Sequence, residues 1–144
     1  MSKSTLLLLS VTVASVFAAG PAMQCDALAA KAFGKDVKIE SATRVAGKEN
    51  LPEHCDVRGV IWPEARFVIK LPAVWNDRFQ MVGNGGTAGV LSMGAVDAAL
   101  RKGFAAASTD TGHDAAKEPL ATFAYVTPGK RNRAVSAAHS DSPA

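Results

Sequence analysis

Four glycines lie close together in this chain, and a backbone without side chains can contact a ligand directly. Gly83, Gly85, Gly86 and Gly89 follow the apolar run 79–82. Glycine adopts positive φ easily and lets another molecule touch the main chain. A loop that leaves a strand and opens a helix also directs backbone N–H groups and the positive end of the helix dipole at an anion. The pattern predicts an anion site, for either a cofactor phosphate or the oxyanion of an ester under attack.

Asp110 and His113 are the titratable residues most suited to lie near that loop, because they follow the small-residue run 104–109. We interpret both as hydrogen-bonding residues that hold loops near the site, with His113 as a general base as the alternative. Ser92 is one position too far from Gly89 for a G-x-S-x-G nucleophile turn. It is better placed to cap the helix that follows the loop.

The segments around the loop predict a strand, a helix and a second strand. Residues 79–82 are expected to form a buried, parallel and central strand, and 104–109 another strand. Residues 93–102 have helical spacing, with Val96, Ala99 and Leu100 inward and Gly103 as the stop. This order is a βαβ unit.

Before this unit, the sequence predicts a short helix and strands in which apolar and polar residues alternate, separated by turns. A short helix is expected over 26–33, ended by Gly34, and a half-buried strand over 37–41. A turn over 49–53 precedes two runs, 57–62 and 66–71, that predict an antiparallel hairpin. Antiparallel strands that lead into a βαβ unit indicate the α/β class, and this is how an α/β-hydrolase fold begins.

The length of 144 residues allows one domain at most. Residues 1–22 have the layout of a signal peptide: Lys3, an apolar run over 6–17, then small residues, with cleavage after Ala18 or Ala22. The apolar core is too short to span a membrane, so we expect a secreted or periplasmic protein with no membrane contact after cleavage. A net charge of +3, or +2 once Lys3 is removed, does not favour nucleic-acid binding.

Cys25 and Cys55 are the two cysteines, and both follow the leader. In an oxidising compartment such a pair most simply forms one disulfide. Closing this loop would contribute about 3–4 kcal/mol in the chain-entropy model.

Several motifs occur together and in order: His54-Cys55-Asp56-Val57-x-Gly59, Leu71-Pro72-x-x-Trp75-Asn76, Arg78-Phe79, Gly83-Asn84-Gly85-Gly86 and Ser108-Thr109-Asp110-Thr111-Gly112-His113. From about residue 25 to about residue 125 the chain resembles the tannase and feruloyl esterase family. The resemblance implies a secreted serine esterase that cleaves small aromatic esters of the gallate or ferulate type. It also implies that Cys25 pairs with Cys55.

Ester hydrolysis passes through an oxyanion that preorganised N–H groups stabilise, and one donor comes from the loop after an early strand. We therefore assign oxyanion-hole donation to Gly85 or Gly86. Gly83, Asn84, Asp110 and His113 are expected to support the loop. A tight turn that needs glycine for its geometry alone is the alternative. No cofactor is expected, and the family's calcium site lies outside this chain.

The chain departs from the family pattern further along. The Cys-Ser-x-Gly-Gly nucleophile elbow does not occur, so no catalytic triad residue is assigned. We expect residues 23–125 to be a partial α/β-hydrolase domain with an incomplete sheet, an N-terminal fragment without turnover of its own. Residues 126–144 are expected to be a divergent, disordered tail. An open apolar sheet edge would favour self-association.

Two other functions fit parts of the sequence. Gly83-x-Gly85-x-x-x-Gly89 between a strand and a helix, with Asp110 after a second strand, also occurs in dinucleotide-binding units of oxidoreductases. The leader, the antiparallel strands and the cysteine pair weigh against that interpretation. An exported, non-catalytic binding domain is the third hypothesis.

Overall fold

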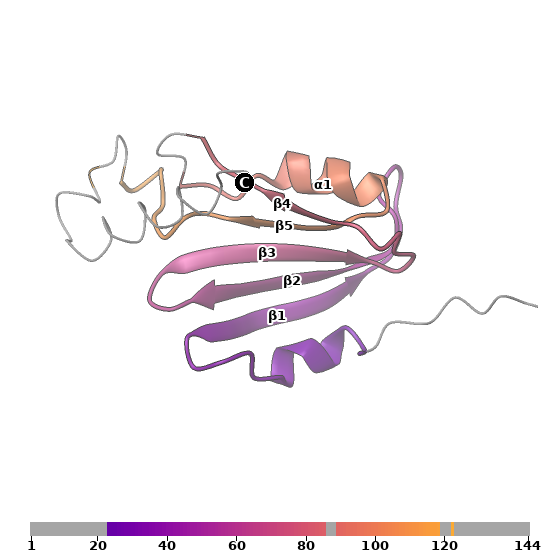
Figure 1. Cartoon of the computed structure of the whole chain (residues 1–144), viewed down its shortest axis with the longest axis horizontal. Helices are drawn as coiled ribbons and strands as arrows, with labels where there is room; N and C mark the ends of the chain where they lie inside the picture. Colours follow the sequence, from indigo (N-terminus) through magenta and orange to yellow (C-terminus); the bar gives the residue numbers. More distant parts are fainter. Residues whose placement is uncertain (1–22, 86–88, 119–121, 123–144) are drawn as a thin grey trace, which may run out of the picture.

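The computed structural model describes residues 23–85, 89–118 and 122 of the chain. They form one mixed five-stranded sheet in the order β1-β2-β3-β5-β4. The elements are the 3-10 helix η1 (Asp26–Ala30), β1 (Val37–Val45), β2 (His54–Ile61), β3 (Ala65–Pro72), β4 (Phe79–Val82), α1 (Met93–Arg101) and β5 (Ala105–Thr109). In Figure 1, α1 lies beside β4 and β5, and η1 lies beside β1 at the other end of the sheet.

The first three strands form an antiparallel meander, which confirms the predicted hairpin. β2 pairs with β3 from His54↔Pro72 to Ile61↔Ala65, and β1 is longer than the strand expected over 37–41. The expected turn over 49–53 is present, with Lys48 and Leu51 bridged across it. β3 then pairs antiparallel with β5, so the meander leads directly into the second half of the sheet.

The helix predicted over 26–33 is wrong in type and length. A five-residue 3-10 helix ends at Ala30, and Lys31 is already extended. None of its residues is buried, and Phe33 is 44% exposed rather than packed inward. A short segment with so little apolar burial cannot offset the cost of starting an α-helix.

The βαβ unit is confirmed in its pairing, because β4 and β5 are parallel from Phe79↔Ala105 to Val82↔Ser108. The prediction that β4 is central and buried is wrong for the described residues. β4 is an edge strand there, and Phe79 and Met81 are 60% and 47% exposed. Phe79 and Met81 lie on one face of β4, and Val82, on the opposite face, packs against the apolar cluster that includes α1. Among the described residues, the face of β4 away from α1 is therefore left uncovered.

Helix α1 covers the parallel half of the sheet as predicted. Val96, Ala99 and Leu100 are buried, and Gly103 follows the helix with φ +78°. Val96 and Ala99 pack with Val68 and Ala106 in one apolar cluster. The small side chains of β5 let the helix approach the sheet closely.

A second apolar cluster lies in the antiparallel half, around the two cysteines and Val57. Leu28 of η1, Ile39 and Ile69 are among the half-buried residues that pack against it. The two clusters therefore stabilise opposite ends of one sheet. Among the described residues, no helix is long and apolar enough to span a membrane.

Candidate functional site

The glycine loop, residues 83–89, begins where β4 ends, at the same sheet edge as the end of β5. Its described residues are 83–85 and 89; Gly86 lies outside them, so its predicted role stays a prediction. Gly85 is exposed, and apart from its chain neighbours no described atom lies within 4 Å of the position its Cβ would take. The side-chain position of Gly85 is therefore open, and the residue is exposed.

Gly89 is the loop glycine whose conformation requires glycine. Its φ is +56°, whereas Gly83 and Gly85 do not have positive φ. A Cβ at Gly89 would run into the imidazole of His113 and lie 2.8 Å from the Ala115 nitrogen. The Ala115 N–H also donates to the Gly89 carbonyl at 3.1 Å. The far end of the loop is thus fixed against the segment that follows β5.

Asn84 fixes the near end of the loop. Its side-chain amide donates to the Thr109 carbonyl at the end of β5. Its oxygen accepts from the Ser92 hydroxyl at 2.8 Å, just before α1. The predicted loop-support residue therefore contacts both segments that adjoin the loop in space.

Asp110 is buried, with 1% of its surface exposed, and joins β3 to β5. Oδ1 accepts from the Arg66 backbone N–H at 2.8 Å and the Gly112 N–H at 3.0 Å. Oδ2 accepts from the Arg66 guanidinium at 2.7 Å. Asp110 therefore links β3 to the turn that follows β5, and its role in supporting the glycine loop stays a prediction.

Arg66 also contacts Asp114, with Nη2 3.3 Å from Oδ2. The hydrogen bond to Asp110 raises the pKa of Arg66, and Asp114 adds to the shift. The pKa of Asp114 is lowered, first by the backbone N–H of Ala116 and then by Arg66. The Arg66 guanidinium thus connects Asp110 and Asp114 on either side of His113, which contacts Gly89.

His113 is buried at 4% exposure, and its Nδ1 lies 3.4 Å from the Thr111 hydroxyl. The hydroxyl of Ser92 is bonded to Asn84, and that of Ser108 accepts from the Ser92 N–H. The described contacts thus give His113 a packing role against Gly89 and bring neither serine to it as a nucleophile.

A cleft of about 400 Å³ lies next to the site. Its lining includes Gly89, Val90 and Leu91 on one side, and Arg58, Arg66 and Glu40 from the sheet. Arg58 forms an ion pair with Asp56, with Nε 2.9 Å from Oδ1, and this hydrogen bond raises the pKa of Arg58. Glu40 and Arg66 were not predicted from sequence. A single charged residue in an alternating strand, such as Arg66, gives no sign in the sequence of the distant side chain that it will contact.

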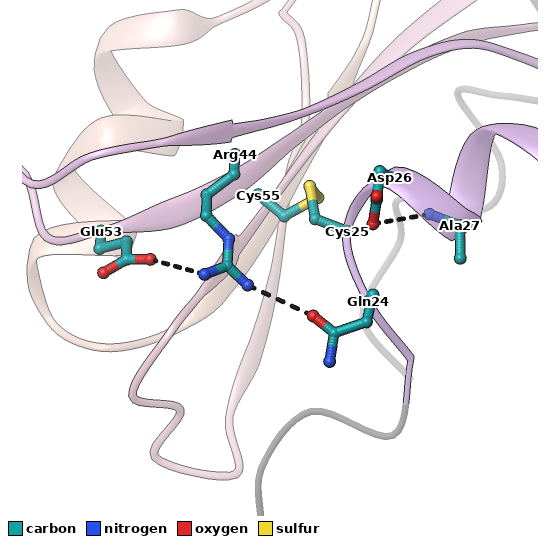
Figure 2. Close-up of a disulfide and its surroundings, with 7 residues drawn as sticks. All are labelled: Gln24, Cys25, Asp26, Ala27, Arg44, Glu53 and Cys55. Carbon is teal, nitrogen blue, oxygen red and sulfur yellow. Dashed lines mark hydrogen bonds and ion pairs between the residues drawn. A yellow bond between two sulfur atoms is a disulfide. The ribbon is translucent and has the colours of Figure 1, made fainter.

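The predicted disulfide is present, with the Cα atoms of Cys25 and Cys55 5.6 Å apart. Figure 2 shows Arg44 beside it, between Glu53 at 3.4 Å and Gln24 at 3.5 Å. The bridge lies in the antiparallel half, and the described glycine-loop residues lie at the end of the parallel half. In the described part of the chain, no group of three or more His, Cys, Asp or Glu side chains is arranged to hold a metal ion.

The sheet order and the loop after β4 define an α/β-hydrolase-like fold, and solved structures agree. An esterase from Aspergillus oryzae matches with a TM-score of 0.56 at 21% identity, covering 62% of this chain and 22% of its own. Feruloyl esterase B from the same organism matches with a TM-score of 0.50 at 23% identity, covering 62% of this chain and 21% of its own.

The family model for tannase and feruloyl esterase matches residues 44–139. The chain belongs to this family. It is 40% identical to the mono(2-hydroxyethyl) terephthalate hydrolase of Piscinibacter sakaiensis over 106 residues, 60% of this chain and 18% of that relative. It is 30% identical over 148 residues to the uncharacterized esterase Atu5261 of Agrobacterium fabrum, covering 83% of this chain. The chain spans less than a third of either relative's length, 18% and 27%.

The dinucleotide-binding alternative loses its main support in this geometry. A ribose hydroxyl would need the Asp110 carboxylate, and that carboxylate is buried and already accepts from Arg66 and Gly112. Membership in an esterase family also weighs against the dinucleotide-binding alternative.

Proposed function

We propose that this chain contributes the oxyanion-binding loop of a serine carboxylic ester hydrolase, with the N–H of Gly85 as donor. The observation that carries the proposal is the exposed backbone of Gly85 at the end of a parallel strand, in a loop fixed at both ends. In this fold class one oxyanion donor comes from such a loop. Gly86 is the alternative donor.

In the reaction, a serine oxygen attacks the ester carbonyl and the carbonyl oxygen becomes an anion. An N–H already directed at that oxygen stabilises the charge without reorganisation. The nucleophile, the acid and the histidine are not assigned to residues of this chain. The chemistry needs a nucleophile, a base and amide donors, and therefore no cofactor.

For substrates we propose aromatic carboxylic esters. The relatives' names support this: one acts on mono(2-hydroxyethyl) terephthalate and one structural neighbour on feruloyl esters. We also propose export to the periplasm or beyond, on the basis of the leader pattern over 1–22 and the disulfide between Cys25 and Cys55.

A graft tests the proposed function. The segment of the Piscinibacter sakaiensis hydrolase that matches this chain is replaced by this chain's own segment, and hydrolysis of mono(2-hydroxyethyl) terephthalate is measured. Gly85→Pro removes the donor N–H, whereas Gly85→Ala keeps it. Gly94→Ala is the matched control, because Gly94 is exposed in α1 and, apart from its chain neighbours and the helix backbone, no described atom lies within 4 Å of its Cβ position.

We expect the graft to hydrolyse the ester, Gly85→Pro to lower kcat by about 10²–10³-fold, and Gly85→Ala to lower it less. The control should match the parent graft. A folded graft without hydrolysis contradicts the proposal. So does a Gly85→Pro variant that folds and keeps the parent kcat.

A further inference from the structure

Two buried or half-buried serines stand behind the glycine loop, and neither has a role in the proposed chemistry so far. Ser108, on β5, is fully buried at 0% exposure. Its hydroxyl oxygen accepts the backbone N–H of Ser92 at 3.1 Å. The Ser92 hydroxyl in turn donates to the Asn84 oxygen at 2.8 Å.

The direction of these bonds determines the orientation of Asn84. The Thr109 carbonyl is only an acceptor, so the Asn84 group that faces it must be the NH₂. The amide oxygen then faces Ser92, whose hydroxyl must be the donor. One side chain with a donor and an acceptor at its tip therefore links the end of β5 to the start of α1.

Ser92 is the helix N-cap residue, yet its side chain does not cap α1. The Ser92 carbonyl accepts the first helical bonds, from Ala95 at 3.2 Å and Val96 at 3.1 Å. Its hydroxyl is free to serve the loop because it makes no bond to the helix N–H groups. Ser92 thus occupies the predicted N-cap position, but the side-chain capping expected from sequence is wrong, because the hydroxyl bonds to Asn84 instead.

We propose that Ser92 and Ser108 are positioning residues for the oxyanion loop, acting through Asn84 on the orientation of the Gly85 N–H. This rests on the proposed function. Ser108 holds the Ser92 backbone, and Ser92 orients the Asn84 amide. Asn84 directly precedes Gly85, so its side-chain bonds restrain the peptide group that carries the Gly85 N–H. A preorganised donor is what the developing oxyanion needs, and a displacement of about 1 Å is enough to lower turnover.

The first test uses the whole chain and the ¹⁵N relaxation of the Gly85 amide. We expect an order parameter near 0.85, as in ordered backbone, and a fall to about 0.6 or below in Ser92→Ala. Ser92→Thr keeps the hydroxyl and should restore the wild-type value. Ser41→Ala, a half-buried serine on β1, is the matched control and should change nothing at Gly85.

Ser108→Ala provides an independent variant, because it removes the acceptor of the Ser92 N–H with little change in volume. It should lower the Gly85 order parameter while Ala106 on β5 stays ordered. A wild-type Gly85 amide that is already below 0.6 contradicts the proposal. A Gly85 amide that is equally ordered in wild type and Ser92→Ala also contradicts it.

The graft separates failure of this inference from failure of the proposed function. There, Ser92→Ala should lower kcat about tenfold with KM within about twofold, and Ser92→Thr should recover it. If Gly85→Pro abolishes turnover and Ser92→Ala leaves kcat unchanged, the function stands and the positioning role is wrong. If the folded graft is inactive while Gly85 order depends on Ser92, the oxyanion function is wrong, and with it the catalytic purpose of the serine link.

Discussion

The two ends of this sheet are stabilised by different means. At the antiparallel end, β1 and β2 are fixed by a disulfide and an apolar cluster around Val57. The parallel end also has an apolar cluster, around Val68 and Val96. In addition, buried polar side chains link its elements: Lys70 contacts Asp97, Ser108 accepts from Ser92, and Asp110 accepts from Arg66. Buried polar groups stabilise less per residue than apolar ones and specify geometry more closely. The end that carries the candidate site therefore combines an apolar cluster with buried polar links between its elements.

The largest expected effect is at the antiparallel end. Cys25→Ala combined with Cys55→Ala should lower the free energy of unfolding by about 3 kcal/mol, because the unfolded chain regains loop entropy. Denaturant titration measures the loss, with reduced wild type as the control. Hydrogen exchange should rise most in β1 and η1. A variant that first loses protection in β5 would contradict the division into two ends.

The next effect is at the parallel end. Asp110→Ala should lower the free energy of unfolding by about 2–3 kcal/mol, because it removes the acceptor of two backbone N–H groups and the partner of Arg66. Asp56→Ala is the matched control, since its pair with Arg58 lies on one strand at the surface, and we expect a loss of about 1 kcal/mol or less. Equal losses in both variants would show that Asp110 is an ordinary surface ion pair.

These two predictions also mark what the sequence could reveal. Val96, Ala99 and Leu100 were predicted as buried because helical spacing is local, and Cys25–Cys55 because the pair had no other partner in sequence. The edge position of β4 was not predicted, because a four-residue apolar strand looks the same whether one or both of its sides are paired.

The sequence allowed several residues of the candidate site to be predicted, but not the hydrogen bonds that join them to residues distant in sequence. Glycine spacing and the end of a strand identified Gly85 and Asp110. Asp110 meets Arg66 across 44 positions and Asn84 meets Thr109 across 25, and no local pattern encodes such contacts. Positive φ, which the sequence analysis associated with the loop glycines, occurs at Gly89 alone among those described, and His113 and Ala115 also leave no room for a side chain there.

A smaller effect concerns the buried Lys70, whose Nζ lies 2.6 Å from Asp97 and ties β3 to α1. Asp97→Ala should cost about 1–2 kcal/mol, since it leaves a buried ammonium unpaired while water reaches one side of the pair. Adding Lys70→Met removes the charge and should recover most of the loss. Thermal unfolding measures both variants, and a double variant less stable than Asp97→Ala would contradict this account.

The smallest effect on stability is expected at the sheet edge. Met81→Lys places a charge on the exposed β4 and should change the free energy of unfolding by less than about 0.5 kcal/mol. It should nevertheless reduce self-association of the chain, measured by sedimentation at several concentrations. An unchanged sedimentation profile would show that β4 does not mediate association.

The most direct test of the central claim is a crystal structure of the graft inactivated by an aryl phosphonate, whose phosphonyl oxygen occupies the place of the oxyanion. We predict that the Gly85 nitrogen lies about 2.7–3.1 Å from that oxygen, with Asn84 bonded to Ser92 and Thr109 as in this structure. A Gly85 N–H that points away from the phosphonyl oxygen, with its donors supplied from elsewhere, would contradict the account.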